Sequence, residues 1–154
     1  MEEIKLDITF KRLKTGMLPK DDYHLFIAAV SAAKRAYAPY SHFNVGAAVL
    51  LDDGTVIEGN NQENIAFPSG LCAERVALFS AGALYPEKPV IAIAIAAIKD
   101  GEIQPFIAPC GACRQVMVET EQRNGLAMRV LLCGMDETIL IASANDLLPF
   151  SFSC

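Results

Sequence analysis

The hydrophobic positions at the start of the chain follow the two-residue period of a strand. Every second residue from 4 to 10 is apolar, and the residues between them are polar. This alternation is typical of a strand with one buried face. Residues 12–20 contain turn-forming glycine and proline, and we expect a connector there. The pattern therefore predicts a strand-like N-terminal extension over residues 1–20, to which the sequence assigns no role.

Helical and hairpin patterns follow the connector. The next apolar residues are spread nearly all round a helix that runs to about Tyr37, so we expect this helix to be largely buried. Asp21 or Asp22 is placed to cap its first turn. Two strand-like runs, residues 43–51 and 55–60, are separated by a tight turn, and together they predict a β-hairpin.

Strands and helices then interleave towards the end of the chain. We expect helices over residues 72–84 and from residue 110 to about residue 122. The apolar run 90–98 predicts a strand that is buried on both faces, and residues 128–134 and 137–143 predict two late strands. This order favours an α/β fold with helices layered on a mixed sheet, since the hairpin excludes a purely parallel one.

Composition and charge narrow the functions that such a domain can have. The 154 residues fit one domain, and 53% of them are hydrophobic, which is enough for a sizeable core. The formal charge is −5 and no basic stripe is visible, so we expect no nucleic-acid partner. No glycine-rich phosphate loop or arginine cluster is present, which disfavours phosphorylated substrates.

The same composition bears on the cellular compartment. The longest apolar run has nine residues, whereas a membrane-spanning helix needs roughly 20, so we expect no membrane partner. The acidic N-terminus lacks the apolar run of a signal peptide. Five cysteines in such a chain indicate reduced thiols for metal binding or catalysis rather than disulfides. We therefore expect a cytoplasmic location.

Three of the cysteines lie at predicted helix starts, where backbone N–H groups and the helix dipole stabilise thiolates. Cys110 and Cys113 are spaced i and i+3 at one helix start, which suits two ligands of one metal ion. Cys72 would supply a third ligand, leaving one position of a tetrahedral zinc open, as in catalytic sites. The alternative is a structural zinc or dithiol redox module built on Cys110 and Cys113, which leaves Cys72 and the carboxylate beside it unexplained.

Charged residues close to the cysteines are candidates for proton transfer and for balancing thiolate charge. Glu74 is placed to act as general base and then general acid beside an open zinc, although acidic residues are also common in a first helical turn. Arg75 and Arg114 can hydrogen-bond the sulfurs from outside the ligand set, or can simply be solvated. His24, in the first helix, and His42, before a strand, offer no obvious fourth ligand.

A set of motifs covers almost the whole chain, from residue 22 to residue 152. Its members are YAPYSHFNVGAAVL, GNNQENIAF, CAERVALFSA, PCGACRQV and LLPFSF. A cysteine followed two residues later by glutamate, and then Pro-Cys-x-x-Cys, is the arrangement of zinc deaminases. The set closely resembles the short, three-cysteine cytidine deaminases. This resemblance implies a three-layer αβα fold around a mixed sheet of about five strands, a catalytic domain over residues 21–154, and one Zn²⁺ in each subunit of a homotetramer.

The activity that the resemblance implies is zinc-dependent, hydrolytic deamination of cytidine and deoxycytidine to uridine and deoxyuridine, with release of ammonia, as in pyrimidine salvage. Its metal ligands would be Cys72, Cys110 and Cys113, and Glu74 would be the catalytic proton carrier. A related deaminase that acts on another amino-pyrimidine, such as blasticidin S, is the alternative within the same chemistry.

Contacts with the small-molecule nucleoside also follow from the resemblance. Asn61 and Glu63 match the pair that binds the ribose 3′-hydroxyl, and Phe43 matches an aromatic that packs against the nucleoside. The backbone N–H of Ala73 would bind the pyrimidine 2-oxo group, and the carbonyl of Ala108 would bind the 4-amino group. Without the resemblance, Asn61 and Glu63 can equally shape a turn, and Phe43 can be a core aromatic.

Two further aromatic positions bear on the site. Phe152 matches an aromatic that is contributed to a neighbouring subunit's site, although phenylalanine is also a common core residue. Phe67 stands where the family often has tyrosine, so the resemblance implies that a hydroxyl contact near the sugar would be missing.

Overall fold

The apolar run at residues 90–98 forms the central strand, β4 (Val90–Lys99), in a computed structural model that describes residues 1–153. β4 pairs antiparallel with β2 (Asn44–Leu51) and parallel with β6 (Arg129–Cys133), so the sheet is mixed, as the sequence predicts. Its alanine and isoleucine side chains over residues 92–97 are fully buried on both faces because helices cover both sides of the sheet.

Four further strands extend this centre. β3 (Val56–Asn60) completes the predicted hairpin with β2 at one edge, and β7 (Glu137–Ile141) pairs antiparallel with β6. β1 (Phe10–Lys14) pairs antiparallel with β7 at the other edge, and β5 (Glu102–Ile103) pairs with the end of β4. The sheet has seven strands where about five were expected, because β1 and the short β5 are added to it.

The N-terminal strand lies later in the chain than its alternation predicts. Expected at residues 4–10, it runs from Phe10 to Lys14, and residues 1–9 are in neither helix nor strand. Phe10 lies opposite Ile141, where β7 ends, so the preceding residues have no adjacent strand among the described residues of the chain. The expected connector is correspondingly shorter, and it begins with the 3₁₀ turn η1 (Thr15–Met17).

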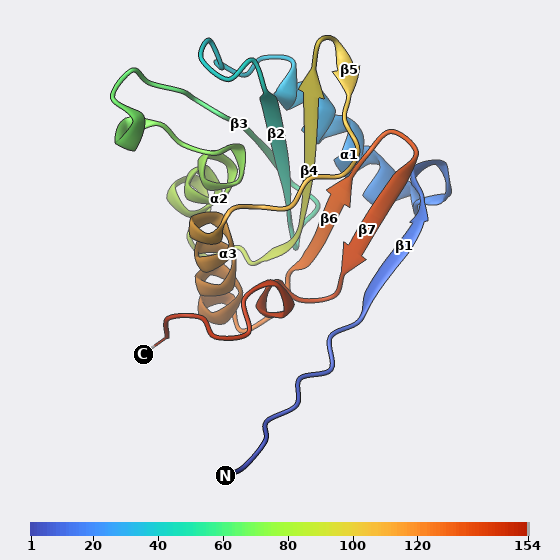
Figure 1. Ribbon diagram of the computed structural model, residues 1–154, viewed down its shortest axis with the longest axis vertical. Coiled ribbons are helices and arrows are strands. Elements are labelled where there is room, and N and C mark those ends of the chain that lie inside the picture. The colour runs from blue at the N-terminus through green and yellow to red at the C-terminus, as the bar shows by residue number, and fades with distance from the viewer. Residues whose placement is uncertain (154) are drawn as a thin grey trace.

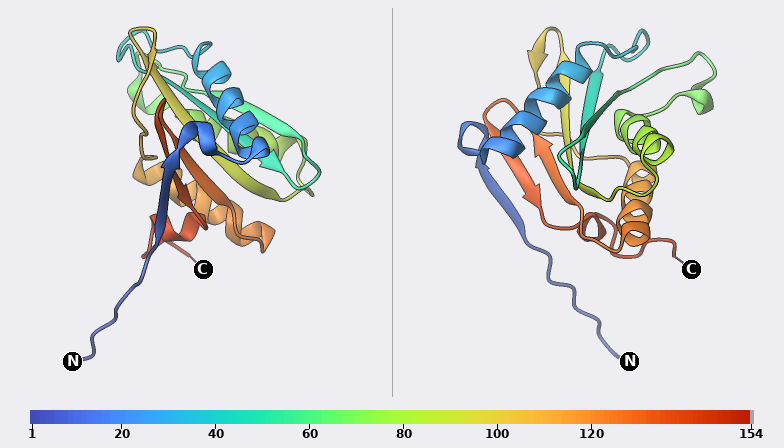
Figure 2. Two further views of the ribbon diagram at one scale, coloured as in Figure 1. Left: turned by 90° about the vertical axis from the view of Figure 1, so that its right-hand side faces the viewer. Right: turned by 180° about the vertical axis from the view of Figure 1, so that it is seen from behind.

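Helices cover both faces of the sheet, which makes three layers (Figures 1 and 2). α1 (Lys20–Ala33) lies on one face, and α2 (Ala73–Leu84) and α3 (Gly111–Asn124) lie on the other. α1 differs from the expected helix in three respects, the first being that its N-cap is Pro19, so that Asp21 and Asp22 lie within the first turn and do not cap it. It is not buried all round, because the side away from the sheet is open and Ile27 is exposed, and it ends before Tyr37.

Pairing outside the helices explains the early end of α1. Tyr37 forms an isolated parallel bridge with Gln62 beyond β3, which requires the chain to leave the helix. Two more 3₁₀ turns, η2 (Phe67–Ser69) and η3 (Ala144–Leu147), lie in the loops. Within residues 1–153, no helix has the length and apolar character that crossing a membrane requires.

Two glycines let helices approach the sheet at backbone distance. A Cβ atom at Gly46 on β2 would lie 2.0 Å from the Ala29 carbonyl oxygen of α1. A Cβ atom at Gly59 on β3 would lie 2.4 Å from the Ala77 amide nitrogen of α2. Neither position has room for a side chain, so α1 and α2 each rest directly on a strand.

Substitution of Gly46 tests this contact. Gly46→Ala is expected to lower the free energy of unfolding by about 1–3 kcal/mol or more, because the added methyl group overlaps backbone atoms of α1. Urea unfolding measures the change. Gly16→Ala is the matched control, since no heavy atom lies within 4 Å of a Cβ atom there. Equal stability of the two variants would contradict the close approach.

Candidate metal centre and adjoining cavity

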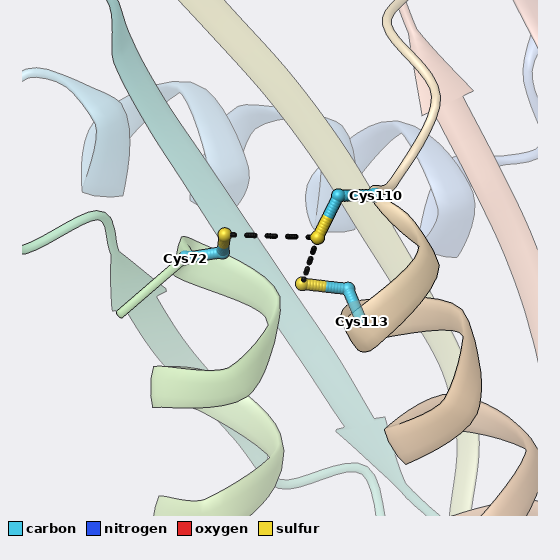
Figure 3. A group of neighbouring side chains, drawn as sticks. All are labelled: Cys72, Cys110 and Cys113. Atoms are coloured by element: carbon cyan, nitrogen blue, oxygen red, sulfur yellow. Dashed lines mark hydrogen bonds between the residues drawn. The ribbon is translucent and has the colours of Figure 1, made fainter. Parts of the chain in front are cut away.

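Three cysteine sulfurs converge where α2 and α3 begin (Figure 3). Cys72 is the N-cap of α2, Cys110 is the N-cap of α3, and Cys113 lies in the first turn of α3. The Sγ atoms of Cys72 and Cys110 are 4.0 Å apart, and those of Cys110 and Cys113 are 3.5 Å apart. The structure thus brings together the three cysteines that the sequence singles out.

The geometry and chemistry of this group fit zinc. Tetrahedral Zn–S bonds of about 2.3 Å place two sulfurs roughly 3.8 Å apart, and the observed separations of 3.5 and 4.0 Å lie on either side of that value. Thiolates are soft ligands that favour zinc over magnesium or calcium. Within residues 1–153 no histidine or carboxylate joins the three sulfurs, and both His24 and His42 are exposed.

The surroundings of the sulfurs favour a thiolate at the start of α2. A hydrogen bond with Cys113 and the nearby guanidinium of Arg75 lower the pKa of Cys72 to about 5. The same hydrogen bond, together with burial, raises the pKa of the Cys113 thiol. Since metal ligation requires deprotonated thiols, a group that already holds one thiolate is prepared for a cation.

Glu74 is buried beside the sulfurs. It lies in the first turn of α2, two residues after Cys72, and only 4% of its surface is exposed. Burial raises the pKa of its carboxyl above the usual range, and the charge of Cys72 adds to this effect. Its position is consistent with the expected proton carrier.

The two arginines near the cysteines have different contacts. Arg75 donates from Nη2 to the Sγ atom of Cys72 at 3.9 Å, the contact expected of a cation that balances thiolate charge. Arg114 turns away from the sulfurs. It donates from Nε to the Pro109 carbonyl at 2.8 Å and from Nη1 to the Leu147 carbonyl at 3.1 Å. Arg114 therefore joins the loop before α3 to the C-terminal turn η3.

A cavity of about 530 Å³ opens beside the start of α2. Its volume lies within the range of small-molecule sites. Five residues singled out from the sequence line it, namely Asn61, Glu63, Phe67, Cys72 and Arg75. The other lining residues are Tyr40, Ser41, Gln62, Asn64, Gly70 and Leu71.

Asn61 and Glu63 also hold one wall of this cavity in shape. The Glu63 carboxylate accepts hydrogen bonds from the Ser41 hydroxyl, from the Tyr40 N–H at 2.9 Å and from the Ser41 N–H at 3.2 Å. The Ser41 hydroxyl contributes most to holding the pKa of Glu63 below its usual value. Asn61 donates to the Phe43 carbonyl at 3.0 Å. Both residues therefore shape the loop, the role left open by sequence, while they also line the cavity.

Four of the expected substrate contacts do not line the cavity. Phe43 is half-buried just before β2, and Ala73 is buried at the first position of α2. Ala108 borders a separate hollow on the side of Phe10. Phe152 is 80% exposed. Their roles towards a substrate stay predictions.

Two contacts near the site were not singled out from the sequence. Gln115 exchanges hydrogen bonds with the backbone of Phe152, donating to its carbonyl at 2.9 Å and accepting from its N–H at 3.0 Å. The position of this glutamine at the end of the motif PCGACRQ is the feature of the sequence that could have drawn attention to it. The rings of Tyr40 and Phe67 meet edge to face, with centroids 6.1 Å apart, at the cavity wall. They come from separate loops, so no local pattern could pair them.

Known proteins that are similar in sequence to this chain belong to one family of deaminases. The family model described as the cytidine and deoxycytidylate deaminase zinc-binding region matches residues 19–128. The chain is 41% identical over 133 residues to a cytidine deaminase of Halalkalibacterium halodurans, a match that spans 86% of this chain and 95% of that protein. It is 36% identical over 136 residues to a cytidine deaminase of Mycobacterium tuberculosis, spanning 88% and 92% of the two chains.

Solved structures are similar in the same region. The crystal structure of a cytidine deaminase from Burkholderia pseudomallei superposes with a TM-score of 0.72 at 45% sequence identity, covering 84% of this chain and 98% of that one. That of a cytidine deaminase from Mycobacterium tuberculosis superposes with a TM-score of 0.66 at 34% identity, covering 88% of this chain and 100% of that one.

Proposed function

The chain belongs to the family of cytidine and deoxycytidylate deaminases that share a zinc-binding region, and on this premise we propose that it deaminates cytidine and deoxycytidine to uridine and deoxyuridine, releasing ammonia. The observation that carries the proposal is the convergence of three sulfurs at two helix starts, beside a buried glutamate and a cavity of small-molecule size. Proteins named as cytidine deaminases match this chain over nearly their full length.

We propose that Cys72, Cys110 and Cys113 hold the zinc ion. When bound, zinc supplies a Lewis acid that lowers the pKa of water from 15.7 to about 7. The hydrogen bond from Arg75 to Cys72 offsets part of the negative charge that three thiolates bring together. Such a site needs reduced thiols, so we further propose a cytoplasmic location for the protein.

Glu74 is the proposed carrier of protons during the reaction. Its carboxylate takes a proton from the attacking water and passes it to N3 of the pyrimidine as the water oxygen adds to C4. The C4 centre becomes tetrahedral, and Glu74 then takes the proton of the new C4 hydroxyl group and delivers it to the amino group, which leaves as ammonia while the C4 carbonyl of the product forms. One carboxyl can perform both transfers because it is regenerated as a carboxylate after the first.

The cavity supports a nucleoside rather than a nucleotide as the substrate. Its acidic lining residue, Glu63, is suited to accept a hydrogen bond from a sugar hydroxyl. Its one cationic lining residue is Arg75, which already donates to the sulfur of Cys72. A phosphate group would therefore meet a carboxylate and no unengaged cation among these lining residues.

The activity is tested by following the ultraviolet absorbance of cytidine as the purified protein is added. We expect turnover of cytidine and deoxycytidine, slower turnover of deoxycytidine monophosphate and blasticidin S, and loss of activity after treatment with a zinc chelator. Restoration by added zinc would separate metal removal from damage to the protein. A faster rate on blasticidin S than on cytidine would assign the chain to the other class of deaminase substrate.

We propose that the protein is a homotetramer in which Phe152 completes the site of a neighbouring subunit. The exposed ring of Phe152 supports this role, since its backbone is fixed by Gln115 while its side chain packs on nothing in its own chain that would bury it. Sedimentation analysis tests the assembly state. A monomer with full activity would remove this part of the proposal.

The link between Gln115 and Phe152 allows a double-mutant test. Gln115→Ala is expected to raise the KM for cytidine several-fold at unchanged zinc content, because the C-terminal segment loses both hydrogen bonds. Phe152→Ala is expected to raise the KM similarly, and the double variant to add little more. Fully additive effects would show that Gln115 does not act through Phe152.

A further inference from the structure

The N-terminal arm, defined as residues 1–12, presents an apolar stripe that its own chain does not cover. Residues 1–9 of the arm lead away from the body of the molecule beyond β1 (Figures 1 and 2). Of its apolar residues, Ile4 is 78% exposed and Phe10 is 50% exposed, and Leu6 and Ile8 between them are exposed as well. Strict alternation places all four on one face if the arm is a strand.

The arm also carries an open strand edge. β1 stands first in the order of the sheet, so one of its edges pairs with β7 and the other has no partner among residues 1–153. Residues 1–9 pair on neither side. An extended, alternating segment with an open edge is a template for pairing with another strand. The family match begins at residue 19, so the arm is not explained by the deaminase region.

We propose that the arm pairs with the arm of a second copy of this chain, as antiparallel strands related by a two-fold axis at Asp7. Each open edge of β1 would then meet the arm of the other copy, and the two sheets would become continuous. The proposal concerns the arm alone and does not depend on the proposed function.

The side chains of the arm are complementary to themselves in this register. With Asp7 on the axis, Glu2 lies opposite Arg12 of the other copy and Glu3 lies opposite its Lys11, so acidic residues meet basic ones at both ends of the paired segment. Opposite charges directly across two strands stabilise their pairing. By the two-fold symmetry each pair occurs twice.

The apolar stripe is continued by the same register. Ile4 lies opposite Phe10 of the other copy, and Leu6 lies opposite Ile8. Residues directly opposite each other point to the same face of a sheet, so the two stripes merge into one apolar surface. A shift by one residue would place every apolar side chain opposite a polar one.

The two nearest registers that also set even-numbered residues opposite even-numbered ones pair the side chains less favourably. An axis at Ile8 places Lys5 opposite Lys11 of the other copy, which sets like charges against each other. An axis at Leu6 places Glu2 opposite Phe10. The register on Asp7 has one unfavourable element, the two aspartates on the axis. The ion pair of Lys5 with Asp7 at 3.7 Å supplies a compensating cation to each aspartate.

A symmetric disulfide tests the proposed axis. Residues opposite each other in antiparallel strands have Cα atoms about 4.5–5.5 Å apart, within the range that a disulfide spans. Asp7→Cys in the full chain is therefore expected to form a disulfide-linked dimer under mild oxidation, identified by mass spectrometry of the linked peptide. The unmodified chain, which keeps its native cysteines, gives the background.

Positions on either side of the axis are the matched controls. Lys5→Cys and Thr9→Cys each place the two equivalent sulfurs about 13 Å apart, given the rise of a strand. Each variant alone is expected to link at least about tenfold more slowly than Asp7→Cys. A mixture of the Lys5→Cys and Thr9→Cys proteins should link one to the other, because these positions lie opposite each other in the proposed register.

A charge exchange provides the second test. The charge variants are made in the Asp7→Cys protein, and the rate at which its disulfide-linked dimer forms is measured. Glu3→Lys alone and Lys11→Glu alone each place like charges across the strands and should slow the link, whereas the two together restore opposite charges and should restore the rate. Circular dichroism checks that each variant is folded. Equal linking at positions 5, 7 and 9, no linking at position 7, or failure of the double exchange to recover would each overturn the proposal.

Discussion

Replacing Glu74 with glutamine is expected to remove nearly all turnover of cytidine while the protein stays folded and keeps its zinc. Glutamine has the size of glutamate, so packing at the start of α2 is retained around a residue with 4% of its surface exposed. It cannot take or deliver the protons that the reaction needs. Loss of a general acid and base lowers a rate by about 10²–10⁴-fold, and kcat measured with saturating cytidine should fall by at least this amount.

Glu121 provides a control for this variant, because it is a second buried glutamate in a different role. Its carboxylate accepts hydrogen bonds from the backbone N–H groups of Met128 at 2.8 Å and Ala144 at 2.7 Å, and from the hydroxyl of Ser143 at 2.5 Å. Glu121→Gln turns an amide towards some of these donors, so it should lower stability by about 1–3 kcal/mol and leave kcat per folded molecule nearly unchanged. The Glu74→Gln variant should instead keep its stability and lose nearly all of its kcat. Retained turnover in Glu74→Gln would exclude Glu74 as the proton carrier.

Replacing Cys113 with alanine is expected to remove both the zinc and the activity. Cys113 is fully buried, and its Sγ lies 3.5 Å from that of Cys110, so no other side chain can take its place without rearrangement of the first turn of α3. With two thiolates left, the site no longer has the three protein ligands of a catalytic zinc. Metal analysis should give about one zinc for each original chain and close to none for the variant.

The matched control for this experiment is Cys133→Ala. Cys133 is also fully buried, and burial raises the pKa of its thiol to about 12, so it is a small packed side chain without thiolate character at neutral pH. Its replacement should change stability modestly and leave zinc content and kcat as they were. A chain that keeps its zinc and turnover after Cys113→Ala would show that the metal is bound elsewhere. Disulfide reductase activity in the original chain would favour the dithiol alternative built on Cys110 and Cys113.

The order of the elements and the positions of the three sulfurs were predictable because their signals are local. The apolar run of β4, the hairpin of β2 and β3, and the cysteines at helix starts each depend on a few neighbouring residues. The arrangement of these elements into three layers, expected from the resemblance, is confirmed by the structure and by solved structures of cytidine deaminases.

Features set by distant partners were not predictable from local patterns. The alternation from residue 4 onwards predicts a strand with one buried face, but residues 4–9 are exposed and unpaired, because β7 ends opposite Phe10 and pairing begins only there. The end of α1 depends on the bridge between Tyr37 and Gln62. Arg114 could not be assigned by its nearness to Cys113, because its partners are the backbone of the preceding loop and of η3.

The backbone-to-backbone contact between Gly59 and α2 affects how freely the sequence can vary around the metal centre. A Cβ atom there would lie 2.7 Å from the Ala73 carbonyl oxygen and 2.4 Å from the Ala77 amide nitrogen, so the first turn of α2 rests on main-chain atoms of β3. The start of this helix is positioned by backbone contacts and not by side chains. The position of Cys72 therefore does not depend on most residues on the outer face of α2. We therefore expect homologous chains to diverge on that outer face, for example at the exposed Phe79, while Gly59 and the two alanines stay small.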